Sequence, residues 1–235
     1  MSLEHRAFVR HAVSCGALRL GGPFRLKSGR TSPYFFDTSR FTTGADLWAL
    51  SEVYVRTILE ASTEHLPDVL FGPAYKGIPL AVACVMQMER LTGHRVGYLF
   101  DRKEAKTHGE HSADAASPAE AARKRLVGHL PHAGQRIVML DDVLTTGGTK
   151  VEALELLELA APGARVEALV IALDRQEAGP GGLTAAQEFS KKTSIPVHPV
   201  LSAVELLEAL QLEGLGDLDE IKALEGHLKA QGVLS

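Results

Sequence analysis

Apolar and polar positions recur along the chain in patterns that predict a series of strands and helices. Short apolar runs bounded by glycine, proline or charged residues are typical of buried strands, and apolar positions three and four apart indicate helices. We expect strands at 69–72, 95–100, 137–140, 166–173 and 196–200. We expect helices at 3–15, 45–61, 78–91, from 151 onward, and at 185–192, 204–210 and 218–230.

This succession predicts an α/β fold with a central, mostly parallel sheet. The strands are continuously apolar, so helices should flank both faces of the sheet. At the amino end we expect short strands at 24–26 and 34–37, with 21–23 (Gly-Gly-Pro) breaking the chain before them. The sequence contains no internal repeat or dividing linker, so we expect its 235 residues to form a single domain.

The segment 137–150, IVMLDDVLTTGGTK, carries the most information about function. Its apolar strand leads to Asp141 and Asp142, and a turn of small, hydroxyl-bearing residues then opens a helix. Backbone N–H groups at such a helix start can bind phosphate. The carboxylates would repel phosphate and are better suited to sugar hydroxyls, so the segment predicts a sugar-phosphate site. The alternative is a polar loop with a helix cap at Thr149, because short motifs recur by chance.

Other polar residues also follow predicted strands. Tyr75 and Lys76 follow one strand, Arg102 and Lys103 the next, and Arg175 a later one. Parallel sheets bind ligands outside the carboxyl ends of their strands. We therefore expect these residues to share one site with the paired acids.

The segment 101–110, DRKEAKTHGE, is rich in cations that can neutralise phosphate oxygens. Gly109 provides a possible hinge for a closing loop. A solvated charged loop is the alternative. Zinc binding by His108 and His111 is disfavoured because no cysteine joins them.

Composition and charge narrow the class of protein. With 45% hydrophobic and 23% charged residues and a net charge of −4, no nucleic-acid partner is expected. The longest apolar stretch, 78–86, is too short to span a membrane, and the amino end lacks a signal core. Cys15 and Cys84 lie in helical patterns, which disfavours a disulfide. We expect a cytoplasmic protein without a membrane partner.

Taken together, five segments resemble the orotate phosphoribosyltransferases, a family of type I phosphoribosyltransferases. The segments, in chain order, are FRLKSGRTSPYFFDTSRF (24–41), FGPAYKG (71–77), DRKEAKTHGE (101–110), LDDVLTTGGT (140–149) and LDRQE (173–177). The resemblance implies the type I phosphoribosyltransferase fold with a small amino-terminal hood over about 1–42. It further implies a mobile lid loop at 101–125 and a homodimer in which the lid reaches the partner subunit's site.

The resemblance also implies a reaction and its residues. The 5-phosphoribosyl group would pass from 5-phosphoribosyl 1-diphosphate (PRPP) to orotate, giving orotidine 5′-monophosphate and pyrophosphate in pyrimidine (UMP) synthesis, with Mg²⁺ held mainly by substrate and water. The residues implied for PRPP are Lys27, Tyr75, Lys76, Asp141, Asp142, Val143, Leu144, Thr145, Thr146, Gly147, Gly148 and Thr149. Those implied for orotate are Phe35, Phe36, Thr145 and Arg175, and the implied catalytic residues are Arg102, Lys103, Lys106 and His108. The Ala74–Tyr75 peptide bond is implied as a candidate for strained or cis geometry.

The chain departs from the family pattern in two places. Gly148 stands where close relatives often have threonine, and the Ala-rich segment 110–124 lengthens the lid. From Ala178 onward the resemblance is weak. Two rival interpretations remain: a phosphoribosyltransferase for another base, disfavoured by the lid motif and Arg175, and a non-catalytic PRPP-sensing regulator, disfavoured by the lack of a basic arm.

Overall fold

The computed structural model describes residues 2–26, 29–62, 65–103, 117–144 and 148–234. Within these residues, one sheet has the strand order β5-β4-β3-β6-β7-β8, and every neighbouring pair is parallel except β4–β5. Its strands are β3 (Val69–Phe71), β4 (Gly97–Asp101), β5 (Leu126–Gly128), β6 (Arg136–Val143), β7 (Arg165–Asp174) and β8 (Val197–Ser202). The predicted α/β class with a mostly parallel central sheet is confirmed.

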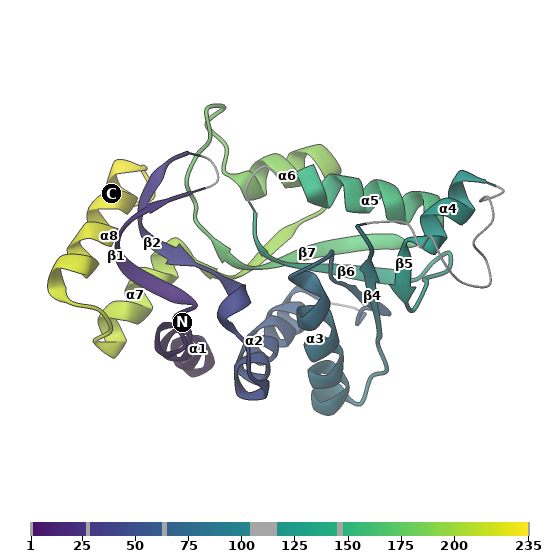
Figure 1. Cartoon of the computed structure of the whole chain (residues 1–235), viewed down its shortest axis with the longest axis horizontal. Coiled ribbons are helices and arrows are strands. Elements are labelled where there is room, and N and C mark those ends of the chain that lie inside the picture. The colour runs from purple at the N-terminus through teal and green to yellow at the C-terminus, as the bar shows by residue number, and fades with distance from the viewer. Residues whose placement is uncertain (1, 27–28, 63–64, 104–116, 145–147, 235) are drawn as a thin grey trace.

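Helices cover both faces of this sheet, as its apolar strands require. One face carries α2 (Gly44–Ala61) and α3 (Gly77–Thr92), and the other carries α5 (Gly148–Ala160) and α6 (Ala185–Thr193), with α4 (Pro118–Lys124) beside α5 (Figure 1). Successive residues of a strand point to opposite faces. In β6, Val138 and Leu140 accordingly join the core cluster on the α2–α3 side, whereas Ile137 and Met139 join the cluster on the α5–α6 side.

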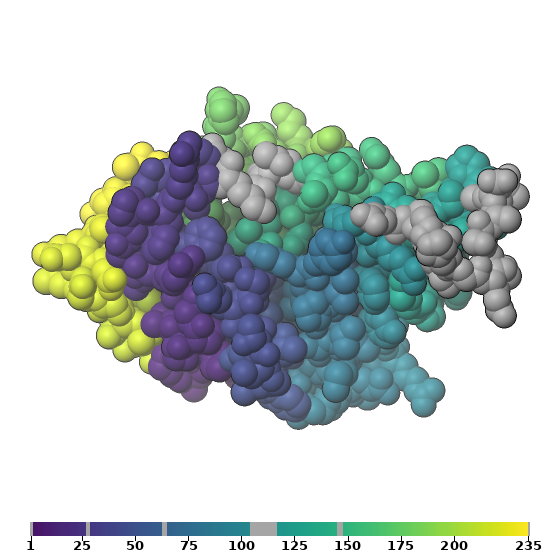
Figure 2. Space-filling view, in the orientation of Figure 1, coloured from purple at the N-terminus to yellow at the C-terminus, as the bar shows by residue number. Residues whose placement is uncertain are grey.

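The amino- and carboxy-terminal elements pack together at one end of the molecule (Figure 2). They are α1 (Leu3–Ser14), β1 (Leu18–Arg25), β2 (Thr31–Phe36), the 3-10 helix η1 (Thr38–Arg40), α7 (Ala203–Glu213) and α8 (Leu218–Ala230). β1 and β2 form an antiparallel hairpin. The expectation that 21–23 break the chain is wrong: these residues lie inside β1. A register shift between Leu20 and Phe24 accommodates them without ending the strand.

Two further features refine the sequence interpretation. β5 was not predicted, because three residues at a sheet edge are too few to show a period. The second half of the Ala-rich segment 110–124 forms the helix α4, from Pro118 to Lys124. Both cysteines are free, with Cys84 buried and Cys15 half-buried. In the described part of the chain, no helix has the length and apolar character needed to cross a membrane.

Candidate functional site

The loop after β3 is held in a tight path at the carboxyl edge of the sheet. A Cβ atom on Gly72 would lie 1.9 Å from the carbonyl oxygen of Gly77, so only glycine allows the two ends of the loop to approach this closely. Asp101, at the end of β4, accepts a hydrogen bond from the Ala74 N–H at 2.6 Å. The Ala74–Tyr75 peptide bond is cis, which confirms the prediction. The loop presents Tyr75 and Lys76 outward.

Lys76 joins three parts of the chain. Its Nζ donates to Asp142 Oδ2 at 2.8 Å and to Asp37 Oδ1 at 2.9 Å, so the loop after β3 meets β6 and the end of the β1–β2 hairpin. Burial opposes the charge on Asp37, but Lys76 and Ser39 outweigh it and lower the pKa of Asp37 to about 2. Burial likewise opposes the charge on Lys76, but the two carboxylates raise its pKa. The lysine therefore stays cationic between two anions while remaining half-exposed.

The paired acids of β6 have different surroundings. Asp141 is buried and forms an ion pair with Lys150 of α5, and its backbone carbonyl accepts a hydrogen bond from the Tyr54 hydroxyl at 2.6 Å. Burial raises the pKa of Asp141, with Lys150 lowering it and Asp142 adding to the rise. For Asp142 burial acts in the same direction, but Lys76 prevails and lowers its pKa. Asp141 thus anchors the strand end to α5, and Asp142 faces Lys76.

Residues on either side of the segment that joins β6 to α5 can be placed. Leu144 is buried in the core, whereas Gly148 and Thr149 are exposed at the first turn of the helix. Thr145, Thr146 and Gly147 lie outside the described residues. The start of α5 therefore adjoins the acids, as a phosphate-binding helix start would require.

Arg175 follows β7 and contacts the β1–β2 hairpin. Its Nη2 donates to Ser32 Oγ at 2.7 Å, and its guanidinium carbon lies 4.1 Å from the centre of the Tyr34 ring. The two predicted phenylalanines do not share an environment. Phe36 is buried against core rings, while Phe35 is half-buried and faces Phe24.

Part of the predicted lid can be placed. Arg102 is half-buried, and its N–H donates to the carbonyl of Arg125, while Lys103 is exposed. Lys106, His108 and the disfavoured zinc partner His111 lie outside the described residues, as does Lys27. The described structure therefore brings Tyr75, Lys76, Asp141 and Asp142 together, with Arg175 directly after β7 and Arg102 directly after β4.

Sequence reasoning missed four residues that organise this edge. They are Asp37, Tyr54, Asp101 and Lys150. Each acts through a contact with another element, so no local pattern identifies it. Asp37 does lie within the 24–41 motif, Asp101 opens the 101–110 segment and Lys150 ends the 137–150 segment, so position within a quoted segment was an available signal for every one of them except Tyr54.

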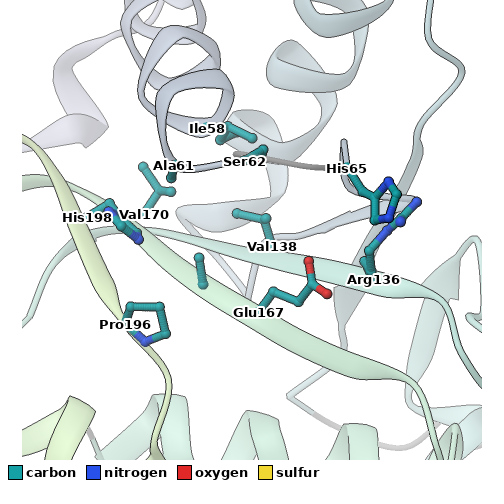
Figure 3. A pocket seen from close by; sticks show the side chains of 11 residues that line it. Ile58, Ala61, Ser62, His65, Arg136, Val138, Glu167, Val170, Pro196 and His198 are labelled. Atoms are coloured by element: carbon teal, nitrogen blue, oxygen red, sulfur yellow. The ribbon is translucent and has the colours of Figure 1, made fainter.

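A separate cavity lies at the opposite, amino ends of the strands (Figure 3). Its volume is about 240 Å³, and Arg136 and Glu167 lie among its polar lining residues, with Val138 and Val170 on its apolar wall. It contains none of the predicted site residues. Its position therefore separates it from the carboxyl-edge site.

Among the described residues, His11, Cys15 and Asp46 also gather potential metal ligands. The Asp46 carboxylate, however, already accepts from His11 at 2.8 Å and from the N–H groups of Thr42 and Thr43 at the start of α2. Asp46 is thereby the third residue of a capping box at the start of α2, whose N-cap is Thr43. The cluster does not include the paired acids.

Comparison with known proteins places this geometry in context. Residues 51–192 match the family model described as a phosphoribosyl transferase domain. The orotate phosphoribosyltransferase of Methylococcus capsulatus is 37% identical and that of Halorhodospira halophila 40%, covering 99% and 96%, respectively, of both chains in each comparison. The crystal structure of the Francisella tularensis orotate phosphoribosyltransferase superposes with a TM-score of 0.75 at 30% identity, over 95% of this chain and 98% of that one.

Proposed function

Because the chain belongs to the phosphoribosyl transferase family and, within it, to the orotate phosphoribosyltransferases, we propose that it transfers the 5-phosphoribosyl group of PRPP to orotate. The products are orotidine 5′-monophosphate and pyrophosphate, and the step serves pyrimidine (UMP) synthesis. The observation that carries the proposal is the cation–anion group of Lys76, Asp142 and Asp37 beside the start of α5. It offers anion-binding and hydroxyl-binding groups within one edge of the sheet.

The reaction exchanges two bonds at the anomeric carbon. A ring nitrogen of orotate bonds to that carbon as the bond to the diphosphate oxygen breaks, and positive charge builds on the ribose, as in other glycosyl transfers. Asp141 and Asp142 hold the ribose hydroxyls, and the turn 143–149 holds the 5′-phosphate. Tyr75, Lys76 and Lys27 bind the diphosphate end of PRPP. No protein nucleophile is required.

Lid cations stabilise the departing diphosphate. Arg102, Lys103, Lys106 and His108 bring positive charge to oxygens that become more negative in the transition state, which is a preorganised electrostatic role. Lys76 supports them from the other side. When diphosphate binds, it can compete with Asp37 and Asp142 for the lysine, because all three are anions within reach of the same half-exposed ammonium.

Mg²⁺ fits this edge if the substrate supplies most of its ligands. The ion prefers oxygen ligands and retains water. The described carboxylates already accept from lysines: Asp37 and Asp142 from Lys76, and Asp141 from Lys150. Each of these three described carboxylates is thus already paired, and we propose that diphosphate, ribose hydroxyls and water hold the ion. Bound there, Mg²⁺ would neutralise charge on the leaving group.

Arg175 recognises the orotate carboxylate in this proposal. A guanidinium donates charge-assisted hydrogen bonds to a carboxylate, and Arg175 lies against Ser32 of the β1–β2 hairpin. Phe35 and Thr145 complete the orotate pocket, and Phe36, buried against Phe8 and Phe41, fixes the strand that carries Phe35. The chain remains one domain, with 1–42 as its hood and 101–125 as its lid, and the cytoplasmic location stays a prediction.

A homodimer with a shared lid is also part of the proposal. An exposed apolar stripe runs along α2 and α3, which lie side by side on one face (Figure 1). Met86 is 70% and Trp48 52% exposed, and Val82 lies one turn before Met86 on the same side of α3. Exposed apolar groups of this kind mark protein interfaces. We assign this stripe to the second copy of the chain.

The dimer of the Met86→Glu variant should have a dissociation constant at least tenfold higher than that of the unchanged protein, because its interface would bury an unpaired charge. Activity should fall in step with the dimer fraction if the lid completes the partner's site. Sedimentation and steady-state rates over a dilution series measure both. Leu212→Glu, which charges an exposed leucine on α7 (60% exposed), is the matched control. A dimer unaffected by Met86→Glu, or a fully active monomer, would contradict the assignment.

An assay of PRPP-dependent orotate consumption tests the function itself. Orotate should disappear only when PRPP and Mg²⁺ are both present, with orotidine 5′-monophosphate and pyrophosphate formed in equal amounts. Adenine, guanine and hypoxanthine in place of orotate test for a different base specificity. Binding of PRPP without turnover of any base would instead support the regulator interpretation.

A further inference from the structure

Glu177 forms the centre of a buried charge cluster that the proposed chemistry does not yet use. Its side chain is only 2% exposed, and two arginines and one histidine face it. Arg175 donates to Glu177 Oε1 from Nη2 at 2.6 Å and from Nε at 3.0 Å. His227 Nε2 lies 2.9 Å from the same oxygen, and Arg30 Nη1 lies 3.4 Å from Oε2. Burial opposes the charge on Glu177, but these neighbours prevail and lower its pKa.

The cluster fixes one edge of the Arg175 guanidinium. Nε and Nη2 of Arg175 both donate to Glu177, and Nη2 also donates to Ser32. The face of the guanidinium packs on the Tyr34 ring. Within the described residues, Arg175 Nη1 makes no hydrogen bond. A guanidinium held along one edge therefore presents the two N–H groups of Nη1 in a single orientation, from which they can donate charge-assisted hydrogen bonds to a carboxylate oxygen.

His227 holds this arrangement from the carboxy-terminal helix. An ionised carboxylate can only accept hydrogen bonds, so Nε2 of His227 must carry the proton that it shares with Glu177. The His227 ring also meets the Tyr34 ring edge-on, with centroids 6.3 Å apart. Tyr34 is thus packed by His227 as well as by Arg175. Helix α8 thereby contacts both groups that orient the arginine.

We propose that His227 and Glu177 are positioning residues for Arg175, so that α8 helps to set the recognition of the orotate carboxylate. The inference rests on the proposed function, in which Arg175 binds that carboxylate. The competing explanation is a purely structural tie between α8 and the loop after β7. The two explanations predict different changes in the KM values for orotate and PRPP when the contact between His227 and Glu177 is removed.

The test compares His227→Ala, His227→Gln and Glu177→Gln in the full-length chain. Steady-state rates are measured with orotate and PRPP varied separately, and unfolding is followed for each variant. His227→Ala should raise KM for orotate about tenfold, the scale of a lost hydrogen bond to a charged group. KM for PRPP should change less than twofold. His227→Gln, whose amide can donate to Glu177, should restore most of the affinity. Glu177→Gln weakens the hold on Arg175 and should also raise KM for orotate selectively.

Lys229→Ala is the matched control on the same helix, because Lys229 pairs within the helix with Glu225. It should leave both KM values unchanged. Equal changes in both KM values, or lower unfolding midpoints in all the cluster variants without a selective orotate effect, would overturn the positioning role. The activity of the unchanged protein distinguishes a failure of the proposed function from a failure of the positioning role. If it consumes no orotate, the proposed function fails and the inference falls with it.

Discussion

The Lys106→Ala variant is expected to lose about two to three orders of magnitude in kcat, the size associated with one lost charge-stabilising donor. The charge of the departing diphosphate grows in the transition state, so a cation that meets it there lowers the barrier more than it strengthens substrate binding. KM for PRPP should therefore change much less than kcat. Initial rates of orotate consumption at saturating PRPP and Mg²⁺ measure the effect.

Lys192→Ala provides the control for Lys106→Ala. Lys192 is exposed on α6 and outside the predicted site, so removing it should leave kcat unchanged. If kcat of the Lys106→Ala enzyme stays within a factor of about two of that of the unchanged protein, Lys106 does not stabilise the transition state. The lid assignment would then need another cation.

The Lys150→Met variant is expected to lose about 3 kcal/mol of unfolding free energy at neutral pH, because removing one partner of a buried ion pair leaves an uncompensated charge. Lys150 and Asp141 are both largely buried, and methionine keeps most of the lysine's apolar length. Chemical denaturation at pH 7 measures the loss. The double variant with Asp141→Asn should recover most of it, since no buried charge then remains.

The pH dependence of Lys150→Met follows from the direction of the Asp141 shift. Burial raises the pKa of Asp141 above its ordinary value even with Lys150 present, and without the lysine it should rise further. The folded variant then binds a proton more tightly than its unfolded chain, so stability falls as pH rises above the unfolded value near 4. The deficit against the unchanged protein should shrink on acidification. A deficit independent of pH would indicate lost packing alone.

The local elements of this fold were largely predictable. The helix expected at 218–230 is α8 with the same bounds, and that expected at 45–61 begins one residue earlier as α2. Hydrophobic periodicity is a property of neighbouring residues, so it survives without knowledge of the fold. β5 lacked enough residues to show any period. The Gly-Gly-Pro run in β1 suggested a break because its pairing with β2 cannot be read locally.

The sequence by itself determined the α/β class, the order of strands and helices along the chain, and the motifs that identify the family. It also placed Lys76, Asp142 and Arg175 at strand ends, where parallel sheets bind ligands. Only the tertiary structure decided which charge meets which. Lys76 pairs with Asp37 of the hairpin, and Asp141 pairs with Lys150 of the next helix. Glu177 contacts both Arg175 and His227, which lies fifty positions after Glu177 in the chain. Such pairs depend on crossovers that bring distant segments to one edge, and short-range patterns carry no record of them.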